Sequence, residues 1–384
     1  MPWKVDSVVS QRLELVKLVA TQQLGVAELA RRFGVSRKTV YKWMARQVDG
    51  EGDLSNRSRR PRGSPHQTDR AIEQRVLELR DAHPAWGGRK LRAVLTREGL
   101  RSPAASTITE ILRRHGKLDP ESAAKHRAFQ RFEREAPNEL WQMDFKGHIP
   151  LTAGGRCHPL TVLDDHSRYS IGLVACDNER GETVSTSLKK MFQRFGMPGQ
   201  MLMDNGSPWG NDRENPWTSL TVWLLKLGVR VSHGRPYHPQ TQGKAERFHR
   251  TLNAELLSTR AFRDIDDCQS QFDPWREVYN FHRPHEALSM GVPGDRYQPS
   301  TRAFPDQFVK WESAPDDQVR KVQQEGRVDF RGKTWHVSKA FRGEQVFLRP
   351  TNIDGKWEVW FGPQCLGQLN ERDESTRRVV RRGD

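Results

Sequence analysis

Apolar residues in the first part of the chain recur at helical spacing in three short segments, residues 8–21, 26–33 and 37–44. We expect the inward side chains to be Leu13, Val16, Val19 and Ala20 in the first helix, Leu29, Ala30 and Phe33 in the second, and Val40, Trp43 and Met44 in the third. Gly34 suits a left-handed helix stop, and Ser36 suits an N-cap. The outer face of the third helix would carry Arg37, Lys38, Tyr41 and Lys42. Residues 1–48 are therefore predicted to form a helix-turn-helix, whose last helix enters the DNA major groove.

Residues 49–68 are rich in Gly, Ser and Pro, which predicts a basic linker and not a packed domain. Four arginines cluster in it around a proline: Arg57, Arg59, Arg60 and Arg62. Such an arm can lie along a DNA minor groove, where arginine meets a strong negative potential. A solvated spacer explains the composition equally well, and both interpretations stay open.

Residues 69–117 repeat the helical pattern and predict a second helix-turn-helix. Its three segments are marked by Ile72, Val76 and Leu79, by Leu91, Val94 and Leu95, and by Thr107, Ile108, Ile111 and Leu112. Two DNA-reading units on one chain would recognise a longer site than either unit alone. Residues 118–136 are polar and predict a connector.

The pattern changes at Pro137, where short strand-like runs begin to alternate with helical ones. The strands expected within residues 137–300 span 140–149, 160–164, 169–176, 200–203 and 229–232, and the helices span 182–195, 218–227 and 243–257. Three strands in succession, followed by strand–helix alternation, predict an α/β domain with a mixed sheet flanked by helices.

Residues 301–370 hold six short strand candidates separated by turn residues such as Asp354 and Gly355, which predicts a small β-barrel. Residues 371–384 are expected to form a disordered tail. The chain as a whole is therefore predicted to be multidomain, with an all-α front, an α/β core and a β-structured C-terminal part.

The positive net charge of the chain indicates a polyanion as its binding partner. The 384 residues carry a formal net charge of +15 at pH 7. The first 136 residues hold 28 Lys and Arg against 16 Asp and Glu, so the excess lies where the DNA-reading units are expected. Four scattered cysteines, no apolar run of membrane-spanning length and no signal-peptide pattern predict a cytoplasmic protein, associated with the nucleoid when bound to DNA.

One carboxylate interrupts an otherwise apolar strand. Asp is depleted in strands, yet Asp144 lies within the predicted strand 141–145. Trp141, Met143 and Phe145 would share one face of that strand, because side chains alternate. Asp144 would therefore point to the other face, beside Gln142.

Two further carboxylates stand at positions that suit an active site. Asp204 follows the strand 200–203, and open α/β sheets place their active sites at the carboxyl ends of strands. Glu246 lies in the first turn of the helix that begins at residue 243. It would sit on the flank of that helix and not on the buried stripe, which comprises Ala245, Phe248, Leu252 and Leu256.

Three clustered carboxylates suit metal-dependent cleavage of a phosphodiester. In-line attack needs an activated water or hydroxyl and a stabilised leaving oxygen, and two Mg²⁺ ions about 4 Å apart supply both. Mg²⁺ prefers carboxylate oxygens, whereas the same acids without a cation would repel one another. Asp144, Asp204 and Glu246 are therefore the candidate ligands of two Mg²⁺ or Mn²⁺ ions.

Five segments carry a family resemblance: Trp141–Phe145, Leu163–Tyr169, Asp204–Ser207, His238–Arg247 and Tyr279–Leu288. They resemble the retroviral-integrase-type DDE transposases of bacterial insertion sequences. The resemblance implies an RNase H-like core over residues 137–300, with the three acids as catalytic metal ligands. It also implies hydrolysis at the ends of a mobile element, followed by transfer of the freed 3′-hydroxyl into target DNA. The implied partners are the terminal inverted repeats, the target DNA and further copies of the chain.

Several residues near the three acids are alternative or supporting candidates. The 41 residues between Asp204 and Glu246 exceed the spacing common in that family, and loops absorb such length cheaply. Glu255 is a weaker candidate for the third acid. Lys244 and Arg247 flank Glu246 and could hold DNA phosphates. Asp164 and Asp165 are expected to be turn and strand-end residues. His282, Arg283 and His285 are expected to be structural, and His233, His238 and His249 are not expected to form a zinc site.

Other functions remain compatible with parts of the pattern. A helix-turn-helix DNA-binding regulator would explain residues 1–117 but not the three acids. A catalytically silent, domesticated transposase would keep DNA binding without chemistry. A hydrolytic RNase H-like nuclease without strand transfer would not need two DNA-reading units.

Overall fold

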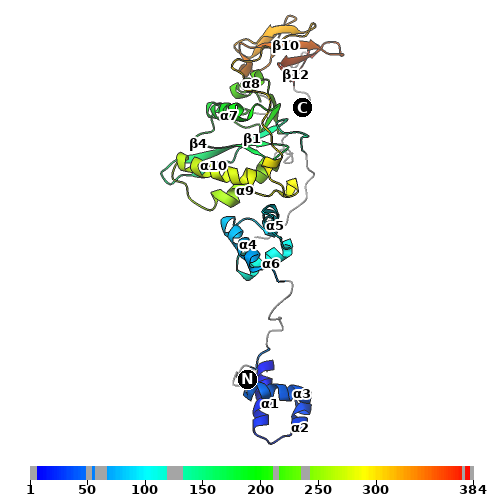
Figure 1. The fold of residues 1–384 in the computed structure, drawn as a ribbon. Coiled ribbons are helices and arrows are strands. Elements are labelled where there is room, and N and C mark those ends of the chain that lie inside the picture. The colour runs from blue at the N-terminus through cyan, green and yellow to red at the C-terminus, as the bar shows by residue number, and fades with distance from the viewer. Residues whose placement is uncertain are drawn as a thin grey trace. The chain divides into compact units, whose positions relative to one another are not determined.

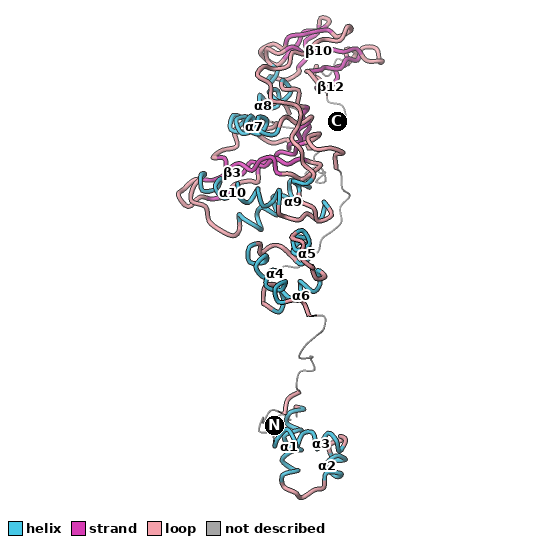
Figure 2. The backbone as a smooth tube through the Cα atoms, viewed as in Figure 1, coloured by secondary structure: helices cyan, strands magenta, loops and turns pink. Residues whose placement is uncertain are grey.

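The computed structural model describes residues 7–48, 54–56, 67–118, 133–210, 216–234, 243–373 and 377–380. The chain forms two compact units, Met1–Gln67 and Thr68–Asp384. The described residues up to 118 contain helices and no strand, and the sheets follow later in the chain (Figure 2). In the part of the chain that is described, no helix is long and apolar enough to cross a membrane.

The described part of the first unit is a bundle of three helices: α1 (Val8–Ala20), α2 (Val26–Arg32) and α3 (Arg37–Val48). Its core comprises Leu15, Val16, Leu29, Ala30, Val40, Trp43 and Leu54. The prediction for Leu13 was wrong: it is 42% exposed, and Leu15 is buried instead. The turn between α2 and α3 is as predicted, with Gly34 at φ +61° and the Ser36 hydroxyl accepting from the Thr39 amide at 3.1 Å.

The second unit begins with a further set of helices: α4 (Arg70–Ala82), α5 (Gly88–Arg97) and α6 (Ala105–Arg114). They pack around Val76, Leu79, Trp86, Leu91, Leu95, Ile108, Ile111 and Leu112. The apolar positions that the sequence marked at helical spacing therefore share one core.

A mixed sheet follows, flanked by helices as predicted. Its described strands are β1 (Trp141–Phe145), β2 (Ile149–Pro150), β3 (Arg156–Asp164), β4 (Ser170–Cys176), β5 (Gln200–Met203) and β6 (Arg230–His233). The strand order is β2-β3-β1-β5-β6, and β4 pairs with β3. β3 is antiparallel to β1 and β4, whereas β5 is parallel to β1 and β6. β1 ends at Phe145, earlier than the predicted strand end at residue 149.

Two apolar clusters cover the two faces of this sheet. The first joins the sheet to α7 (Gly181–Phe195) and α8 (Ser219–Lys226). The second joins it to α9 (Gly243–Leu252), the π-helical turn η3 (Asn253–Leu257) and α10 (Ile265–Phe281). Figure 1 shows α7 on one side of the strands and α9 with α10 on the other. Short 3-10 turns at Glu286–Leu288 and Pro293–Asp295 end this part of the chain.

The C-terminal strands form at the predicted places: β7 (Gln318–Lys321), β8 (Arg327–Phe330), β9 (Lys333–His336), β10 (Gln345–Pro350), β11 (Lys356–Phe361) and β12 (Gln364–Asn370). A 3-10 turn at Lys339–Phe341 precedes β10. The predicted barrel is corrected. The described strands form an open antiparallel sheet in the order β12-β11-β10-β7 and a separate β8-β9 hairpin. A barrel requires its end strands to pair continuously, and here β7 and β12 do not pair with each other.

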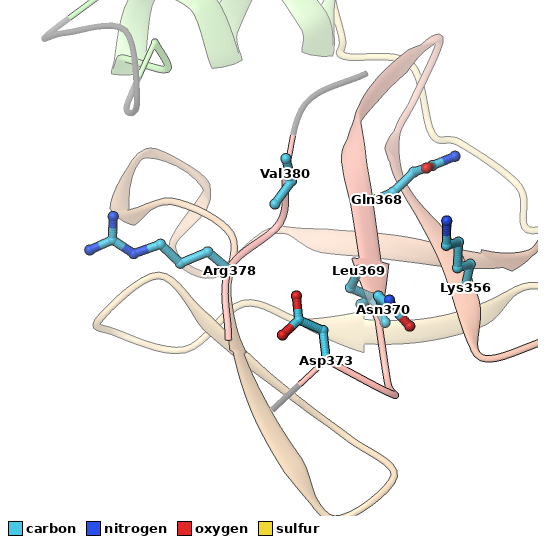
Figure 3. Close-up of a pocket in the computed structure, with 7 residues that line it drawn as sticks. All are labelled: Lys356, Gln368, Leu369, Asn370, Asp373, Arg378 and Val380. Atoms are coloured by element: carbon cyan, nitrogen blue, oxygen red, sulfur yellow. The ribbon is translucent and has the colours of Figure 1, made fainter. Parts of the chain in front are cut away.

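Two short pieces of the predicted tail are described, residues 371–373 and 377–380. Residues 377–380 make isolated bridges to His336 of β9 and Gln368 of β12. Figure 3 shows this segment beside β12, where Arg378 and Val380 face a cavity of about 170 Å³. The cavity is also lined by Lys356, Gln368, Leu369, Asn370 and Asp373. The other residues of the predicted tail, 374–376 and 381–384, lie outside the described residues.

Candidate active site

Asp144 points away from the apolar side of β1, as the alternation predicted. Trp141 and Met143 belong to the cluster under α7 and α8, and Phe145 packs against it. Asp144 therefore shares the opposite face with Gln142, the face that α9 covers. It pairs with Thr161 across the antiparallel ladder to β3, so it lies in the middle of the sheet.

Asp204 lies next to Asp144 because β5 runs parallel to β1. Trp141 pairs with Met201 and Gln142 with Leu202, and Asp204 follows β5 directly, so the parallel pairing brings Asp204 toward Asp144. Neighbouring strands lie about 5 Å apart, and residues in register project to the same face. The Asp204 side chain also accepts a hydrogen bond from the Gly206 amide at 2.9 Å, which fixes the turn after β5.

Glu246 lies in the first turn of α9 and is exposed. Phe248 and Leu252 are buried in the second cluster, and Ala245 is buried as well, as the helical spacing predicted. Glu246 therefore stands on the flank of the helix that covers the face of Asp144. The loop before α9, including His238, lies outside the described residues.

The electrostatics tie these acids together. The pKa of Asp144 is raised to about 7, first by burial and then by the negative charges of Asp204, Glu179 and Glu246. The pKa of Asp204 is also raised, again first by burial, with Glu179 adding to the effect. Four carboxylates thus act within one region, where a cation would be bound favourably.

The donor chemistry fits a hard divalent cation, because carboxylate oxygens are the ligands that Mg²⁺ and Mn²⁺ prefer. Among the described residues, however, no three side chains of His, Cys, Asp or Glu converge closely enough to hold one ion in common. Asp144, Asp204 and Glu246 are therefore coupled by charge, but they do not form a closed ligand set in this structure.

Two residues near Asp144 were missed by the sequence analysis as parts of this site. His249 lies one turn after Glu246, and its Nδ1 is 3.9 Å from Oδ2 of Asp144. Burial lowers the pKa of His249 to about 4, and the charge of Lys146 adds to this effect. Glu179 follows β4 and pairs with His158 at 2.8 Å. The position of His249 three residues after Glu246 was a usable signal, whereas nothing in the sequence singled out Glu179.

The expected DNA-binding residues differ in their exposure to solvent. Arg37, Lys38, Tyr41 and Lys42 are all exposed on α3, and Arg247 is exposed on α9. Lys244 instead turns inward, where its ammonium group lies 2.5 Å from Oδ1 of Asp165. Arg57, Arg59, Arg60 and Arg62 lie outside the described residues.

The weaker candidates are engaged in structural contacts. Glu255 pairs with Arg283 at 2.8 Å, and both side chains are only 10% exposed. Asp164 is buried at the end of β3 and Asp165 in the turn that follows, as predicted, and both accept hydrogen bonds from backbone amides. His249 is hydrogen-bonded to Thr161, and His233 to the backbone oxygen of Trp209.

Family models match five parts of the chain. An integrase core domain matches residues 134–239, and a second integrase core model matches 227–293. The C-terminal domain of IS481 family transposases matches 317–377. A helix-turn-helix domain matches 11–62, and a homeodomain-like domain matches 39–112. The mixed sheet and its flanking helices are thus the RNase H-like core that the sequence predicted.

Relatives and solved structures are similar to the chain at low identity. A putative transposase of the insertion element IS5376 from Geobacillus stearothermophilus is 21% identical over 93% of this chain and 87% of its own length. An IS407 protein from Burkholderia multivorans is 27% identical over 60% of this chain and 82% of its own length.

Among solved structures, a simian T-cell lymphotropic virus intasome chain matches with a TM-score of 0.37 and 16% identity, covering 76% of this chain and 97% of that one. The HTLV-2 integrase catalytic core, solved with magnesium, matches with a TM-score of 0.33 and 15% identity, covering 43% of this chain and 99% of that one. The sequence matches carry the assignment: the chain belongs to the DDE-type transposases with an integrase core, an IS481-family C-terminal domain and N-terminal helix-turn-helix domains.

Proposed function

We propose that this transposase cuts DNA at the ends of its element and joins the freed 3′-hydroxyls to target DNA, with Asp144, Asp204 and Glu246 as the catalytic acids. The observation that supports the proposal is the effect of the Asp204 and Glu246 charges on the pKa of Asp144, and the parallel β1–β5 pairing agrees with it because it brings the end of β5 toward β1. In the first step water attacks the phosphorus, and the bond to the 3′-oxygen breaks. In the second step that 3′-hydroxyl attacks a target phosphate and displaces another 3′-oxygen.

The three acids would hold two Mg²⁺ or Mn²⁺ ions. When bound, such ions lower the pKa of the attacking oxygen and stabilise the leaving oxygen. Asp144 lies in β1 and Asp204 directly follows β5, so both would form the fixed part of the site. Glu246 is exposed, so its carboxylate can turn toward them by side-chain rotation.

DNA recognition would be divided among the domains. We propose that Arg37, Lys38, Tyr41 and Lys42 on α3 contact the terminal inverted repeat, and that residues 69–117 contact a neighbouring stretch. The basic linker at residues 49–68 would follow the DNA between them, and Arg247 would contact phosphate near the active site. Joining two element ends at one target needs two active sites, so we propose a homo-oligomer on DNA.

The test is cleavage and strand transfer on a duplex that carries the terminal repeat of the element, with Mg²⁺ or Mn²⁺. We expect Asp144→Asn, Asp204→Asn and Glu246→Gln each to abolish both reactions while binding the duplex as tightly as the wild type. Asp266→Asn, an exposed acid in α10, is the matched control and should keep full activity. An active Glu246→Gln protein would remove the third acid from the proposal. A wild-type chain that binds but never cuts would favour a DNA-binding regulator or a silent transposase.

A further inference from the structure

Asp165 is a fully buried carboxylate with both oxygens engaged. Its side chain is 0% exposed. Oδ1 accepts hydrogen bonds from Nζ of Lys244 at 2.5 Å and from Nε2 of Gln142 at 2.8 Å. Oδ2 accepts from the Arg134 amide at 2.9 Å. The backbone oxygen of Asp165 receives a second, longer contact from Lys244 at 3.2 Å.

These contacts connect the two elements that carry Asp144 and Glu246. Gln142 precedes Asp144 by two residues in β1, so the two side chains leave the same face of the strand. Lys244 precedes Glu246 by two residues in α9, where a step of two places side chains on nearly opposite flanks. The contact between Lys244 and Asp165 therefore limits the rotation of α9 about its axis. It thereby fixes the direction in which the Glu246 side chain leaves the helix.

The apolar contacts of α9 do not fix that rotation as tightly. Its buried apolar residues are Ala245, Phe248 and Leu252, and apolar packing is not directional. A buried ion pair is directional, because both charges lose water and each must keep its partner. Lys244 is only 17% exposed, and its ammonium group contacts the buried Asp165 carboxylate at 2.5 Å.

We propose that Asp165 is a positioning residue, whose carboxylate bridges Gln142 and Lys244 and thereby sets Glu246 relative to Asp144. This inference rests on the proposed function of the three acids. Lys244 then acts inside the protein, which differs from the DNA contact expected from the sequence. The bridge joins residues that are 79 positions apart in the chain.

The neighbouring Asp164 supplies a matched control. It is as buried as Asp165, each residue being 1% exposed. Its carboxylate accepts from the Asn138 amide at 2.7 Å and from the amide and hydroxyl of Ser167 at 2.8 and 2.6 Å. Among the described residues these contacts lie within the turn and its surroundings, and none comes from α9. Asp164 and Asp165 thus have the same side chain and the same burial, but only Asp165 contacts α9.

The experiment compares Asp165→Asn with Asp164→Asn in the full chain without DNA. We expect both variants to melt at lower temperature than the wild type. In Asp165→Asn alone, backbone amides of residues 247–250 should exchange hydrogen at least tenfold faster, and the Mn²⁺ concentration for half-maximal thermal stabilisation should rise about tenfold. Lys244→Met should match Asp165→Asn, the double variant should be no worse than either, and Lys244→Arg should stay close to the wild type.

The outcomes separate this inference from the proposed function. Equal exchange in Asp164→Asn and Asp165→Asn, or no change in either, would overturn the positioning role. If Glu246→Gln weakens Mn²⁺ stabilisation but Asp165→Asn does not, the positioning role fails alone. If Glu246→Gln leaves Mn²⁺ stabilisation unchanged, the assignment of the third acid fails, and hydrogen exchange in α9 still decides what Asp165 does.

Discussion

Nδ1 of His249 faces the carboxylate of Asp144 at 3.9 Å without being its salt-bridge partner at neutral pH. Thr161 donates its single hydroxyl hydrogen to the backbone oxygen of Asp144 at 2.8 Å, so it must accept from Nε2 of His249 at 2.8 Å. The hydrogen of the neutral imidazole is therefore on Nε2, and Nδ1 presents a lone pair to Asp144. His249 therefore does not neutralise the negative charge of an ionised Asp144, and this carboxylate can bind a cation.

His249 should matter to the reaction through the orientation of the strand residue it contacts. We expect His249→Ala to slow strand transfer about tenfold or more. A lost buried hydrogen bond costs about 1–3 kcal/mol, and a loss of that size in the orientation of Asp144 would raise the activation barrier by a similar amount. His249→Asn keeps a donor for Thr161 and should recover part of the rate. Single-turnover joining assays measure both variants, and an unchanged rate for His249→Ala would exclude the role.

The raised pKa of Asp144 makes the stability of the metal-free protein depend on pH. In the folded state the pKa is about 7, against an ordinary value of 3.8, so the folded state holds a proton that the unfolded state releases. The native protein therefore loses stability as pH rises from about 4 to about 7, by up to about 4 kcal/mol at 1.4 kcal/mol per pKa unit. Asp144→Asn lacks this loss.

Urea unfolding without metal at pH 4 and pH 8 measures that difference. We expect Asp144→Asn to be more stable than the wild type at pH 8 and nearly equal to it near pH 4. Saturating Mn²⁺ should reverse the order at pH 8, because the wild type alone keeps the full ligand charge. An advantage of Asp144→Asn that does not change with pH would contradict the raised pKa.

The buried pair of Glu255 and Arg283 should affect folding and not chemistry. Removing one partner leaves an uncompensated buried charge, so Glu255→Gln and Arg283→Met should each cost about 3–5 kcal/mol of unfolding free energy. Their Mn²⁺ requirement should match that of the wild type wherever the variants are folded. Denaturant curves and thermal shift with Mn²⁺ check both parts, and a selective loss of Mn²⁺ binding in Glu255→Gln would make it a ligand candidate again.

The exposed face of α3 should contribute to DNA affinity through phosphate contacts. We expect Lys38→Ala and Lys42→Ala each to weaken binding of the full chain and to reduce the slope of log K against log salt by about 1. Lys17→Ala, on the exposed face of α1, should leave the slope unchanged. Fluorescence anisotropy at several salt concentrations measures it, and equal slopes for all three variants would remove α3 from the interface.

The parts of the site that depend on local pattern could be predicted from the sequence. Alternation in β1 set the face of Asp144, and helical spacing in α9 set the flank of Glu246. Leu13 was misplaced because the segment around it offers apolar residues on more than one flank, and packing with α3 decides between them. The barrel was wrong because strand order is settled by pairing between distant residues, which short strands do not encode.

The residues that support the acids could not be predicted for the same reason. The contact of Lys244 with Asp165 and that of His249 with Thr161 join residues 79 and 88 positions apart. In the sequence, Lys244 is an ordinary cation on a polar helical turn, for which contact with DNA is the simpler interpretation. Only the packing of α9 against the sheet shows that its ammonium group faces a buried carboxylate.

Residues 377–380 have a consequence for how the C-terminal sheet meets other molecules. Gln368 and Val380 exchange backbone hydrogen bonds of 2.7 and 2.8 Å, and His336 exchanges two more with Arg377 and Val379. The exposed edge of strand β12 is thereby covered by residues of the same chain. A strand of another molecule therefore cannot pair with that edge. Shortening the protein before Arg377 would uncover that border, so a truncated form should self-associate through it, whereas the longer form stays protected.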